Sequence, residues 1–331
     1  MKVMITGGSG FIGGHLAKEC SDRGYITHIY DNNCRGEQDS FIENLLQRDG
    51  VEFFQFDLTK EKNYKHIDKD YDVIYHLAAI NGTENFYNFP YSVMEVALKS
   101  TMLLLEHFRG SSTRFIFSSS SEVYAGTLKN NPELIPTAEN ISCTIEDVTN
   151  ERFSYGGSKL ACEILINSFA KQHGLEYQII RYHNIYGPRM GTKHVIPQFV
   201  YRAKSKESPF KIYGGFESRA FCYIDDAVTA TLLLATTPSA NQIIHIGNDL
   251  EEIEIRHVAE KIKAWYAIQR IPLELHPAPA GCVRRRCPNI KKLQLLTGYQ
   301  PLTLLDDGLK LTIEWYNQWY DENTIELDGL L

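Results

Sequence analysis

Near its start the chain reads Lys2-Val3-Met4-Ile5-Thr6-Gly7-Gly8-Ser9-Gly10-Phe11-Ile12-Gly13. A short apolar strand leads directly into a turn rich in glycine, and a helical pattern follows from Phe11 to about Arg23. This order of strand, turn and helix is typical of dinucleotide binding, because a helix N-terminus attracts the negative charge of a pyrophosphate. We expect Gly7 and Gly10 to let the backbone turn and approach the pyrophosphate, and Gly13 to let helix and strand pack closely.

Asp31 indicates which dinucleotide is bound. It ends a second predicted strand, Thr27 to Tyr30, where a carboxylate accepts hydrogen bonds from the adenosine ribose. The same charge repels the additional phosphate of NADP, so the sequence favours NAD as the cofactor. Arg35, close to this strand end, keeps NADP open as an alternative.

Strands and helices alternate along the first half of the chain. The alternation predicts an α/β fold with a doubly wound parallel Rossmann sheet, whose ligands gather at the carboxyl ends of the strands. The stretch 125–150 is rich in turn formers and predicts a surface excursion. Further strands are expected at 51–56, 73–77, 114–119 and 177–181, and helices near 40–48, 91–108 and 155–172.

Residues 186–331 show a looser pattern, because several prolines and the pair Gly214-Gly215 interrupt it. We therefore divide the chain into a NAD-binding Rossmann domain, residues 1–185, and a smaller C-terminal substrate-binding lobe, residues 186–331. Some segments of the lobe are expected to return to the Rossmann domain. The lobe should cover the crevice of the sheet and hold the substrate.

The composition fits a soluble globular protein. Of 331 residues 43% are apolar, enough for a large core, and no run approaches the ~20 apolar residues of a membrane span. A net charge of −7 argues against nucleic acid as a partner. The seven cysteines are scattered and lack zinc spacing, so we expect reduced thiols and no metal. Because the chain begins directly with a strand rather than a signal sequence, we predict a cytoplasmic protein.

The segment Tyr155-Gly156-Gly157-Ser158-Lys159 predicts a tyrosine that transfers a proton. Residues four apart lie on one face of a helix, so the ammonium of Lys159 can approach the phenol of Tyr155 and lower its pKa from the ordinary value of about 10. Such a tyrosine can take a proton from an alcohol. The segment Ser118 to Tyr124, at the end of a predicted strand, adds several hydroxyls and the carboxylate of Glu122.

Several further segments carry a family resemblance. They are Phe56-Asp57-Leu58, His76-Leu77-Ala78-Ala79, Arg181-Tyr182-His183-Asn184-Ile185-Tyr186-Gly187-Pro188-Arg189, Ser218-Arg219-Ala220-Phe221-Cys222-Tyr223-Ile224-Asp225-Asp226-Ala227 and Ile246-Gly247-Asn248. With them, nearly the whole chain resembles the extended short-chain dehydrogenases/reductases of the nucleotide-sugar epimerase, dehydratase and decarboxylase group. The resemblance implies a nucleoside-diphosphate sugar as substrate and a homodimer formed by the helices near 91–108 and 155–172.

The resemblance also assigns roles to residues. Ser120 matches the family's catalytic Ser/Thr, and Tyr155 matches the catalytic base. Lys159 matches the lysine that lowers the pKa of the tyrosine and contacts the ribose. The reaction implied is oxidation of the sugar at C4 with NAD, which gives a keto sugar. The predicted cofactor-binding residues are Gly7, Gly10, Phe11, Ile12, Gly13, Asp31, Asn32, Asp57, Leu58, Leu77, Ala78, Ala79, Tyr155, Lys159 and Tyr182.

Glu122 is the candidate base of a second step, since a ketone at C4 acidifies the proton at C5 and activates C6. Members that decarboxylate or dehydrate their sugar resemble this chain in having Glu here, so both reactions stay open, and a purely structural acid is the alternative. Arg286 aligns with an arginine that decarboxylases use near the sugar carboxylate, although other members use this region for phosphate. The predicted substrate-binding residues are Asn184, His194, Tyr213, Arg219 and Arg286.

Other functions stay open beside this one. A nucleotide-sugar 4-epimerase or a net 4-dehydrogenase would use the same first step, and an NAD-binding sensor or scaffold would use the fold without turnover. The complete set of Ser120, Tyr155 and Lys159 argues against the sensor. Two segments depart from the resemblance: Ala97 replaces an asparagine found beside the nicotinamide, and the loop 81–87, where sugar specificity is often set, is distinctive.

Overall fold

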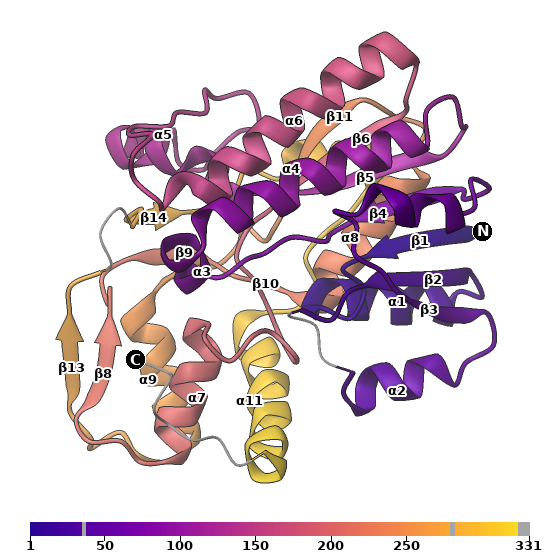
Figure 1. Cartoon of the computed structure of the whole chain (residues 1–331). Helices are drawn as coiled ribbons and strands as arrows, with labels where there is room; N and C mark the ends of the chain where they lie inside the picture. Colours follow the sequence, from indigo (N-terminus) through magenta and orange to yellow (C-terminus); the bar gives the residue numbers. More distant parts are fainter. Residues whose placement is uncertain (35–37, 279–281, 324–331) are drawn as a thin grey trace.

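A seven-stranded parallel sheet forms the centre of the computed structural model, which describes residues 1–34, 38–278 and 282–323. Its strands are β1 (Lys2–Thr6), β2 (Ile26–Asp31), β3 (Val51–Gln55), β4 (Val73–His76), β5 (Arg114–Ser120), β6 (Tyr177–Tyr182) and β11 (Gln242–Ile246). They follow the order β11-β6-β5-β4-β1-β2-β3, and every neighbouring pair runs parallel. The chain builds outwards from β1 in both directions, so the predicted doubly wound Rossmann sheet is confirmed (Figure 1).

Helices cover both faces of this sheet (Figure 1). The helices of the described residues, including those of the C-terminal part, are α1 (Phe11–Asp22), α2 (Ser40–Leu46), α3 (Thr83–Asn88), α4 (Pro90–His107), α5 (Ala125–Asn130), α6 (Phe153–His173), α7 (Val195–Lys204), α8 (Ile224–Thr236), α9 (Ile255–Trp265), α10 (Lys291–Thr297) and α11 (Leu305–Glu322), with the 3-10 turns η1 (Glu61–His66), η2 (Ser121–Tyr124) and η3 (Pro132–Leu134). Successive side chains of a strand point to opposite faces. Val3 and Ile5 of β1 therefore pack in a hydrophobic cluster with Leu16 of α1, whereas Met4 packs in another with Leu104 of α4.

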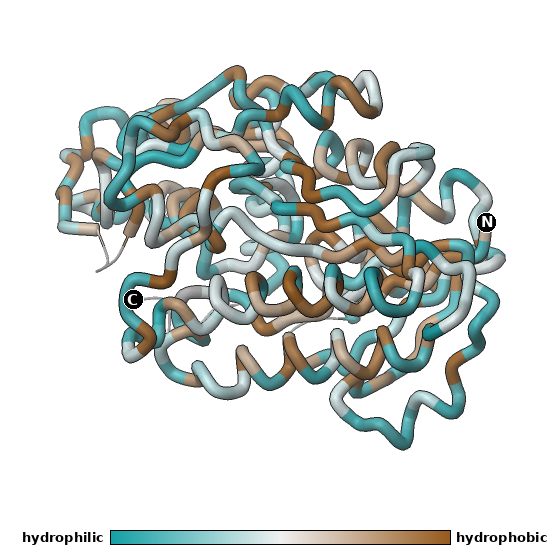
Figure 2. Tube along the Cα trace, turned by 90° about the horizontal axis from the view of Figure 1, so that it is seen from above, coloured by the Kyte–Doolittle hydropathy of each residue, from teal (hydrophilic) through white to brown (hydrophobic). Residues whose placement is uncertain are grey.

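Several helices are amphipathic, most clearly α7, α9 and α11. Figure 2 shows hydrophobic and hydrophilic stretches alternating along the helices, as expected where one side of a helix is buried and the other faces water. Within the described ranges, the helices are too short or too polar to cross a membrane.

The C-terminal part of the chain adds small sheets and a group of helices. Here β8 (Phe210–Tyr213) pairs with β13 (Leu273–His276), β7 (Ile185–Tyr186) pairs with β10 (Cys222–Tyr223), and β9 (Ser218–Ala220) lies between β12 (Glu252–Glu254) and β14 (Arg285–Arg286). α7, α9 and α11 pack together beside these sheets (Figure 1).

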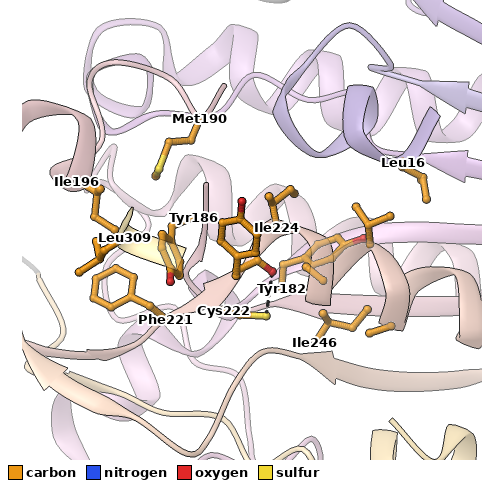
Figure 3. Packing of buried hydrophobic residues seen from close by; sticks show 14 of the residues in the cluster. Leu16, Tyr182, Tyr186, Met190, Ile196, Phe221, Cys222, Ile224, Ile246 and Leu309 are labelled. Carbon is orange, nitrogen blue, oxygen red and sulfur yellow. Dashed lines mark hydrogen bonds between the residues drawn. The ribbon is translucent and has the colours of Figure 1, made fainter. Parts of the chain in front are cut away.

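One hydrophobic cluster joins this part to the sheet. It includes Leu16 of α1, Tyr182 of β6 and Leu309 of α11, and Figure 3 shows its residues meeting around Tyr186 and Ile224. β11 adds an edge strand to the main sheet although it lies far along the chain. The division into domains at residue 185 is therefore a proposal about function, since the two parts share a core.

The segment 125–150 is more closely packed than the sequence indicated. Its first four residues, in α5, are buried, and Leu128 and Ile135 join a hydrophobic cluster with Ala220 and Val283. The prediction of a surface excursion was therefore wrong for the first part of this segment. Its apolar residues follow neither a helical nor a strand period, so the pattern gave no sign of burial.

Candidate active site

The glycine turn between β1 and α1 leaves no room for side chains. Gly7 has a φ of +70°, and a Cβ on it would lie 2.8 Å from the backbone nitrogen of Ala78, at the end of β4. A Cβ on Gly13 would lie 2.2 Å from the carbonyl oxygen of Gly7, so α1 packs directly on the turn. Gly10 is the N-cap of α1. The helix N-terminus thus lies next to the carboxyl ends of β1 and β4, where a pyrophosphate can be bound.

Asp31, at the end of β2, is fixed next to this turn. Its Oδ2 accepts a hydrogen bond from the backbone N–H of Ser9 (3.1 Å), and its Oδ1 accepts one from the backbone N–H of Asn33 (2.9 Å). Each carboxylate oxygen can accept a further bond, so the group can also hold a ribose diol. Arg35, which kept NADP open, lies outside the described residues.

The other predicted cofactor residues follow the same edge of the sheet. The backbone N–H groups of Leu77 and Ala78 donate to the main-chain and side-chain oxygens of Thr6, at 3.1 and 3.3 Å. Tyr182 differs, because its buried hydroxyl is hydrogen-bonded to Thr231 of α8 at 2.8 Å and so points into the core. Phe11 and Ile12 begin α1, Asp57 and Leu58 follow β3, Asn32 follows Asp31, and Ala79 follows Ala78.

Tyr155 and Lys159 lie one helical turn apart on α6. The Nζ of Lys159 lies 5.7 Å from the ring centroid of Tyr155 and donates a hydrogen bond to the carbonyl oxygen of Ser118 (2.6 Å). Burial lowers the pKa of Lys159 to about 8. The ring of Tyr155 stacks on Phe86 of α3, with centroids 4.9 Å apart and an interplanar angle of 14°. The phenol is therefore held between an ammonium group and an aromatic face.

Ser120 ends β5, and Glu122 lies in the η2 turn that follows. The hydroxyl of Ser120 accepts a hydrogen bond from the backbone N–H of Glu122 (3.2 Å), which caps the turn. A Cβ on Gly156 of α6 would lie 2.7 Å from the carbonyl oxygen of Glu122. This close packing fixes Glu122 next to the helical turn that carries Tyr155.

Two guanidinium groups hold the Glu122 carboxylate. Arg152 Nη2 lies 3.0 Å from Oε2, and Arg286 Nη1 lies 2.5 Å from Oε1. Burial alone would raise the pKa of Glu122, but the charges of Arg286 and Arg152, with a smaller contribution from Arg219, outweigh it and lower the pKa. The carboxylate is therefore ionised and paired at neutral pH.

Arg219 and Arg286 are register partners on the parallel strands β9 and β14. Burial and the neighbouring charge of Arg286 lower the pKa of Arg219 to about 10. Nη2 of Arg219 donates to the sulfur of Cys282 (3.3 Å), which is a weak acceptor. Together with Arg152, these two guanidinium groups surround the single carboxylate of Glu122, and this excess of positive charge favours a further anion.

The three other predicted substrate residues lie on elements around this pair. Asn184 has a φ of +44° and donates from Nδ2 to the carbonyl oxygen of Ala220 in β9 (3.1 Å), so it adjoins the arginine pair. Tyr213 is half exposed at the end of β8 and stacks on His276 of β13 at 4.8 Å. His194 is the N-cap residue of α7.

Comparison with known proteins agrees with this arrangement. Residues 3–247 match the NAD-dependent epimerase/dehydratase family. The chain belongs to this family. It is 31% identical over 326 residues to the UDP-N-acetyl-alpha-D-glucosaminuronate decarboxylase of Bacillus cytotoxicus, covering 96% of this chain and 98% of the relative. It is 29% identical to GDP-mannose 3,5-epimerase 1 of Oryza sativa subsp. indica, and the match covers 96% of this chain and 82% of that relative.

A solved member of the family has the same architecture. The UDP-glucose 4-epimerase of Thermotoga maritima, determined with UDP-glucose, superposes with a TM-score of 0.85 at 27% identity, over 96% of this chain and 99% of that one. Membership in an NAD-dependent family confirms the predictions of family and cofactor. The residues fit NAD, since the turn at Gly7 and Gly13 excludes side chains and Asp31 adjoins it.

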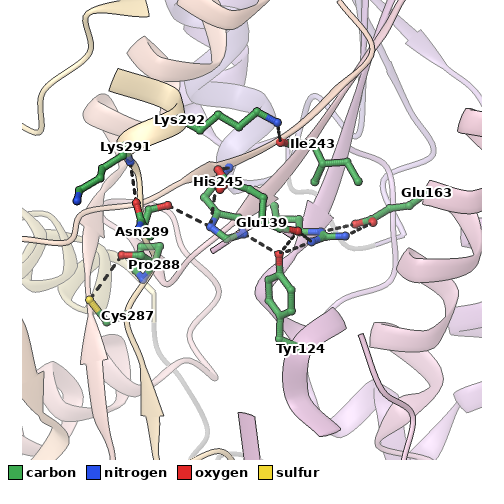
Figure 4. A network of polar contacts seen from close by, with 11 residues as sticks. Tyr124, Glu139, Glu163, Ile243, His245, Cys287, Pro288, Asn289, Lys291 and Lys292 are labelled. Carbon is green, nitrogen blue, oxygen red and sulfur yellow. Dashed lines mark hydrogen bonds and ion pairs between the residues drawn. The ribbon is translucent and has the colours of Figure 1, made fainter. Parts of the chain in front are cut away.

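A buried polar network supports the site of this epimerase/dehydratase family member (Figure 4). Arg181 and Glu163 form an ion pair at 2.5 Å, with side chains only 4% exposed. Glu163 also accepts a hydrogen bond from Ser119 (2.5 Å), and the Tyr124 hydroxyl bonds both Arg181 and His245. These contacts join β5, η2, β6, α6 and β11, so they fix the strand ends and the helix that carry the catalytic candidates.

Three site residues escaped the sequence analysis. Arg152 pairs with Glu122, and Phe86 stacks on Tyr155. The guanidinium of Arg189 donates to two carbonyl oxygens of the glycine turn. Arg189 ends one of the family segments, so that segment was a usable signal. Phe86 lies in the loop 81–87, which the sequence marked as distinctive without showing a contact to Tyr155. Arg152 belongs to no marked segment, and only the fold brings it to Glu122.

Proposed function

We propose that this family member oxidises C4 of a nucleoside-diphosphate hexuronate and then decarboxylates the resulting ketone. The observation that carries the proposal is the group of Arg152, Arg219 and Arg286 around one carboxylate, that of Glu122. Partly buried guanidinium groups in excess bind anions. A nucleoside-diphosphate hexuronate brings two anions, the diphosphate and the sugar carboxylate. We assign Arg219 to the diphosphate and Arg286 to the carboxylate.

In the first step Tyr155 takes the proton of the C4 hydroxyl while Ser120 hydrogen-bonds the same oxygen. Bound NAD supplies the acceptor for the hydrogen at C4. Lys159 assists because its ammonium is fixed near the Tyr155 ring by the carbonyl oxygen of Ser118. The product is a 4-keto sugar whose carboxylate lies β to the ketone.

In the second step the bond between C5 and C6 breaks, CO₂ leaves, and the electron pair moves into an enolate at C4. Tyr155 can return its proton to that oxygen. The resulting enol must then gain a proton at C5 and give its O–H proton back to Tyr155. We assign the transfer at C5 to Glu122, which first takes up a proton from solvent. With a hexuronate bound, Arg286 serves two carboxylates, so its hold on Glu122 weakens and the pKa of Glu122 rises from its lowered value.

The ion pairs of Glu122 with Arg152 and Arg286 favour decarboxylation over dehydration. Loss of water requires a base that removes the proton from C5, and a carboxylate with a lowered pKa is a weak base. Decarboxylation requires no such base, because the departing CO₂ leaves its electrons behind. Glu122 as the base of a dehydratase, which the sequence suggested, is therefore the less favoured role.

The test is the mass of the product. The purified protein is incubated with UDP-, GDP-, CDP- and dTDP-linked hexuronates and with the matching neutral hexoses, and the sugar nucleotides are analysed by mass spectrometry. We expect one hexuronate to lose CO₂ and the neutral hexoses to be unchanged. Loss of water from a hexose would contradict the proposal.

A 4-epimerase is the second candidate. The similarity to the Thermotoga maritima UDP-glucose 4-epimerase supports it, and oxidation at C4 by the same Tyr155 would serve it. Epimerisation leaves the mass unchanged and inverts C4, so NMR of the product separates it from decarboxylation.

We also propose a homodimer formed through α4 and α6. These neighbouring helices expose large apolar side chains, Tyr91, Met94 and Met102 on α4 and Ile164 on α6. Exposed apolar groups on adjacent helices favour a protein interface. Sedimentation of the wild type and of Ile164→Glu tests the dimer. The cytoplasm is the proposed location, since the cysteines are free thiols, as in reducing compartments.

A further inference from the structure

We propose that Arg152 is a positioning residue for the second step, which keeps the Glu122 carboxylate in place while Arg286 binds the substrate. The inference rests on the proposed decarboxylation. The two arginines bind different oxygens of the Glu122 carboxylate: Arg152 bonds Oε2 at 3.0 Å, and Arg286 bonds Oε1 at 2.5 Å. Each oxygen has its own partner, so one arginine can change partners without releasing both oxygens.

Arg152 belongs to the same packed unit as Glu122 and the catalytic tyrosine. It directly precedes α6, its side chain is 8% exposed, and its backbone N–H donates to Asn150 Oδ1 at 3.0 Å. Tyr155 lies one turn further along α6, where Gly156 packs against the carbonyl oxygen of Glu122. The start of α6 therefore fixes both the base of the first step and the carboxylate of the second.

Arg286 reaches Glu122 from a different part of the chain. It lies on β14, beside Arg219 on β9, among the candidate substrate contacts. A sugar carboxylate that binds Arg286 competes with Glu122 for the same guanidinium. If Arg152 were absent, Glu122 would then lose its second partner and could turn to other rotamers. With Arg152 present, Oε2 stays bound and Oε1 is released for proton transfer at C5.

One buried atom of Arg152 suggests a role in substrate binding, which kinetics can distinguish from positioning. Its Nε is buried and has no hydrogen-bond partner in the ranges that the structure describes. A substrate oxygen could accept that bond, and Arg152 would then be a binding residue. Removing a contact made equally to substrate and transition state raises KM and leaves kcat, whereas loss of positioning lowers kcat.

The experiment compares Arg152→Gln and Arg152→Lys with the wild type. Single turnovers with the hexuronate that the enzyme accepts are followed by reduction of bound NAD and by release of CO₂. For Arg152→Gln we expect NAD reduction near the wild-type rate, CO₂ release slowed about 10²-fold, and a smaller change in KM. Arg152→Lys should restore part of the rate. A raised KM with unchanged kcat, or an equal loss in both steps, would overturn the inference.

Arg285→Gln is the matched control. Arg285 is the neighbour of Arg286 on β14, but it pairs with Glu252 at 2.7 Å and its side chain is 45% exposed. The variant removes one cation from the same strand and leaves the Glu122 cluster complete, so its turnover should stay at the wild-type level. Slow CO₂ release in this variant as well would show a general charge effect and contradict a specific role of Arg152.

A second measurement needs no substrate. Carboxyl ¹³C NMR of the protein labelled in glutamate follows the titration of Glu122, whose signal is assigned by its loss in Glu122→Gln. We expect the midpoint to move to higher pH in Arg152→Gln, because one of two stabilising charges is gone. An unchanged midpoint would refute the contact. If no hexuronate loses CO₂, the proposed function fails, while this titration still decides whether Arg152 controls Glu122.

Discussion

Two adjacent glycines of α6 allow a direct test of how Glu122 is fixed. Alanine replaces each in turn, and both variants gain the same helix propensity, about 1 kcal/mol. Their surroundings differ. A Cβ on Gly157 meets only Ile145 Cδ1 at 3.9 Å, an ordinary contact, whereas a Cβ on Gly156 lies 2.7 Å from the Glu122 carbonyl oxygen. We expect Gly157→Ala to stabilise the protein by about 0.5–1 kcal/mol.

Gly156→Ala must push η2 away from α6. A comfortable separation requires a shift of roughly 0.5 Å or more, and such overpacking costs about 1–3 kcal/mol. Because the propensity gain is common to both variants, Gly156→Ala should be less stable than Gly157→Ala by about this cost. The shift also moves Glu122 relative to Tyr155, and we expect CO₂ release to slow by about tenfold or more.

Urea unfolding followed by circular dichroism gives the difference in stability, and the turnover rate gives the second readout. Gly157→Ala controls for the helix and for the loss of glycine flexibility. Equal stability and equal activity of the two variants would show that the packing of Gly156 on Glu122 has no consequence.

Three shorter predictions concern other residues of the site. Asp31→Ala should narrow the preference for NAD over NADP in calorimetry, since the charge that repels the second phosphate is gone; tighter binding of NADP by the unmutated protein would contradict the assignment. Tyr155→Phe should bind NAD normally but fail to reduce it with substrate, and near-normal turnover would exclude Tyr155 as the base. The folded pKa of Glu122 is lowered, so its stabilising effect is complete above the ordinary value of about 4.3 and is lost as the pH falls through the folded value. The stability difference between wild type and Glu122→Gln, measured in urea from about pH 6 to about pH 3, should therefore shrink on acidification, and a constant difference would refute this.

The sheet could be predicted because its signals are local. The glycine turn stands between an apolar strand and a helix, and Asp31 ends the next strand. β6 was likewise expected at the position where it lies, and it ends one residue later than predicted, at Tyr182. Local patterns of this kind depend on backbone conformation and burial of one segment, so they are visible before the fold is known.

The arginine cluster could not be predicted, because its members come from distant segments. Arg152 precedes α6, Glu122 follows β5, and Arg286 lies on β14. The sequence marked Glu122 and Arg286 separately and gave no sign that they form an ion pair. Likewise, the motif around Tyr182 suggested a cofactor contact, but nothing in it showed that the hydroxyl bonds Thr231 in the core. Contacts between segments require the fold.

The most direct test of decarboxylation follows the C6 carbon of the substrate. A nucleoside-diphosphate hexuronate labelled with ¹³C at C6 is incubated with the protein and NAD, and ¹³C NMR is recorded during the reaction. We expect the carboxylate signal to disappear and bicarbonate to appear at the same rate, and we expect this reaction to require the Arg286 and Glu122 pair. Retention of the label in the sugar, with C4 inverted or water lost, would contradict decarboxylation.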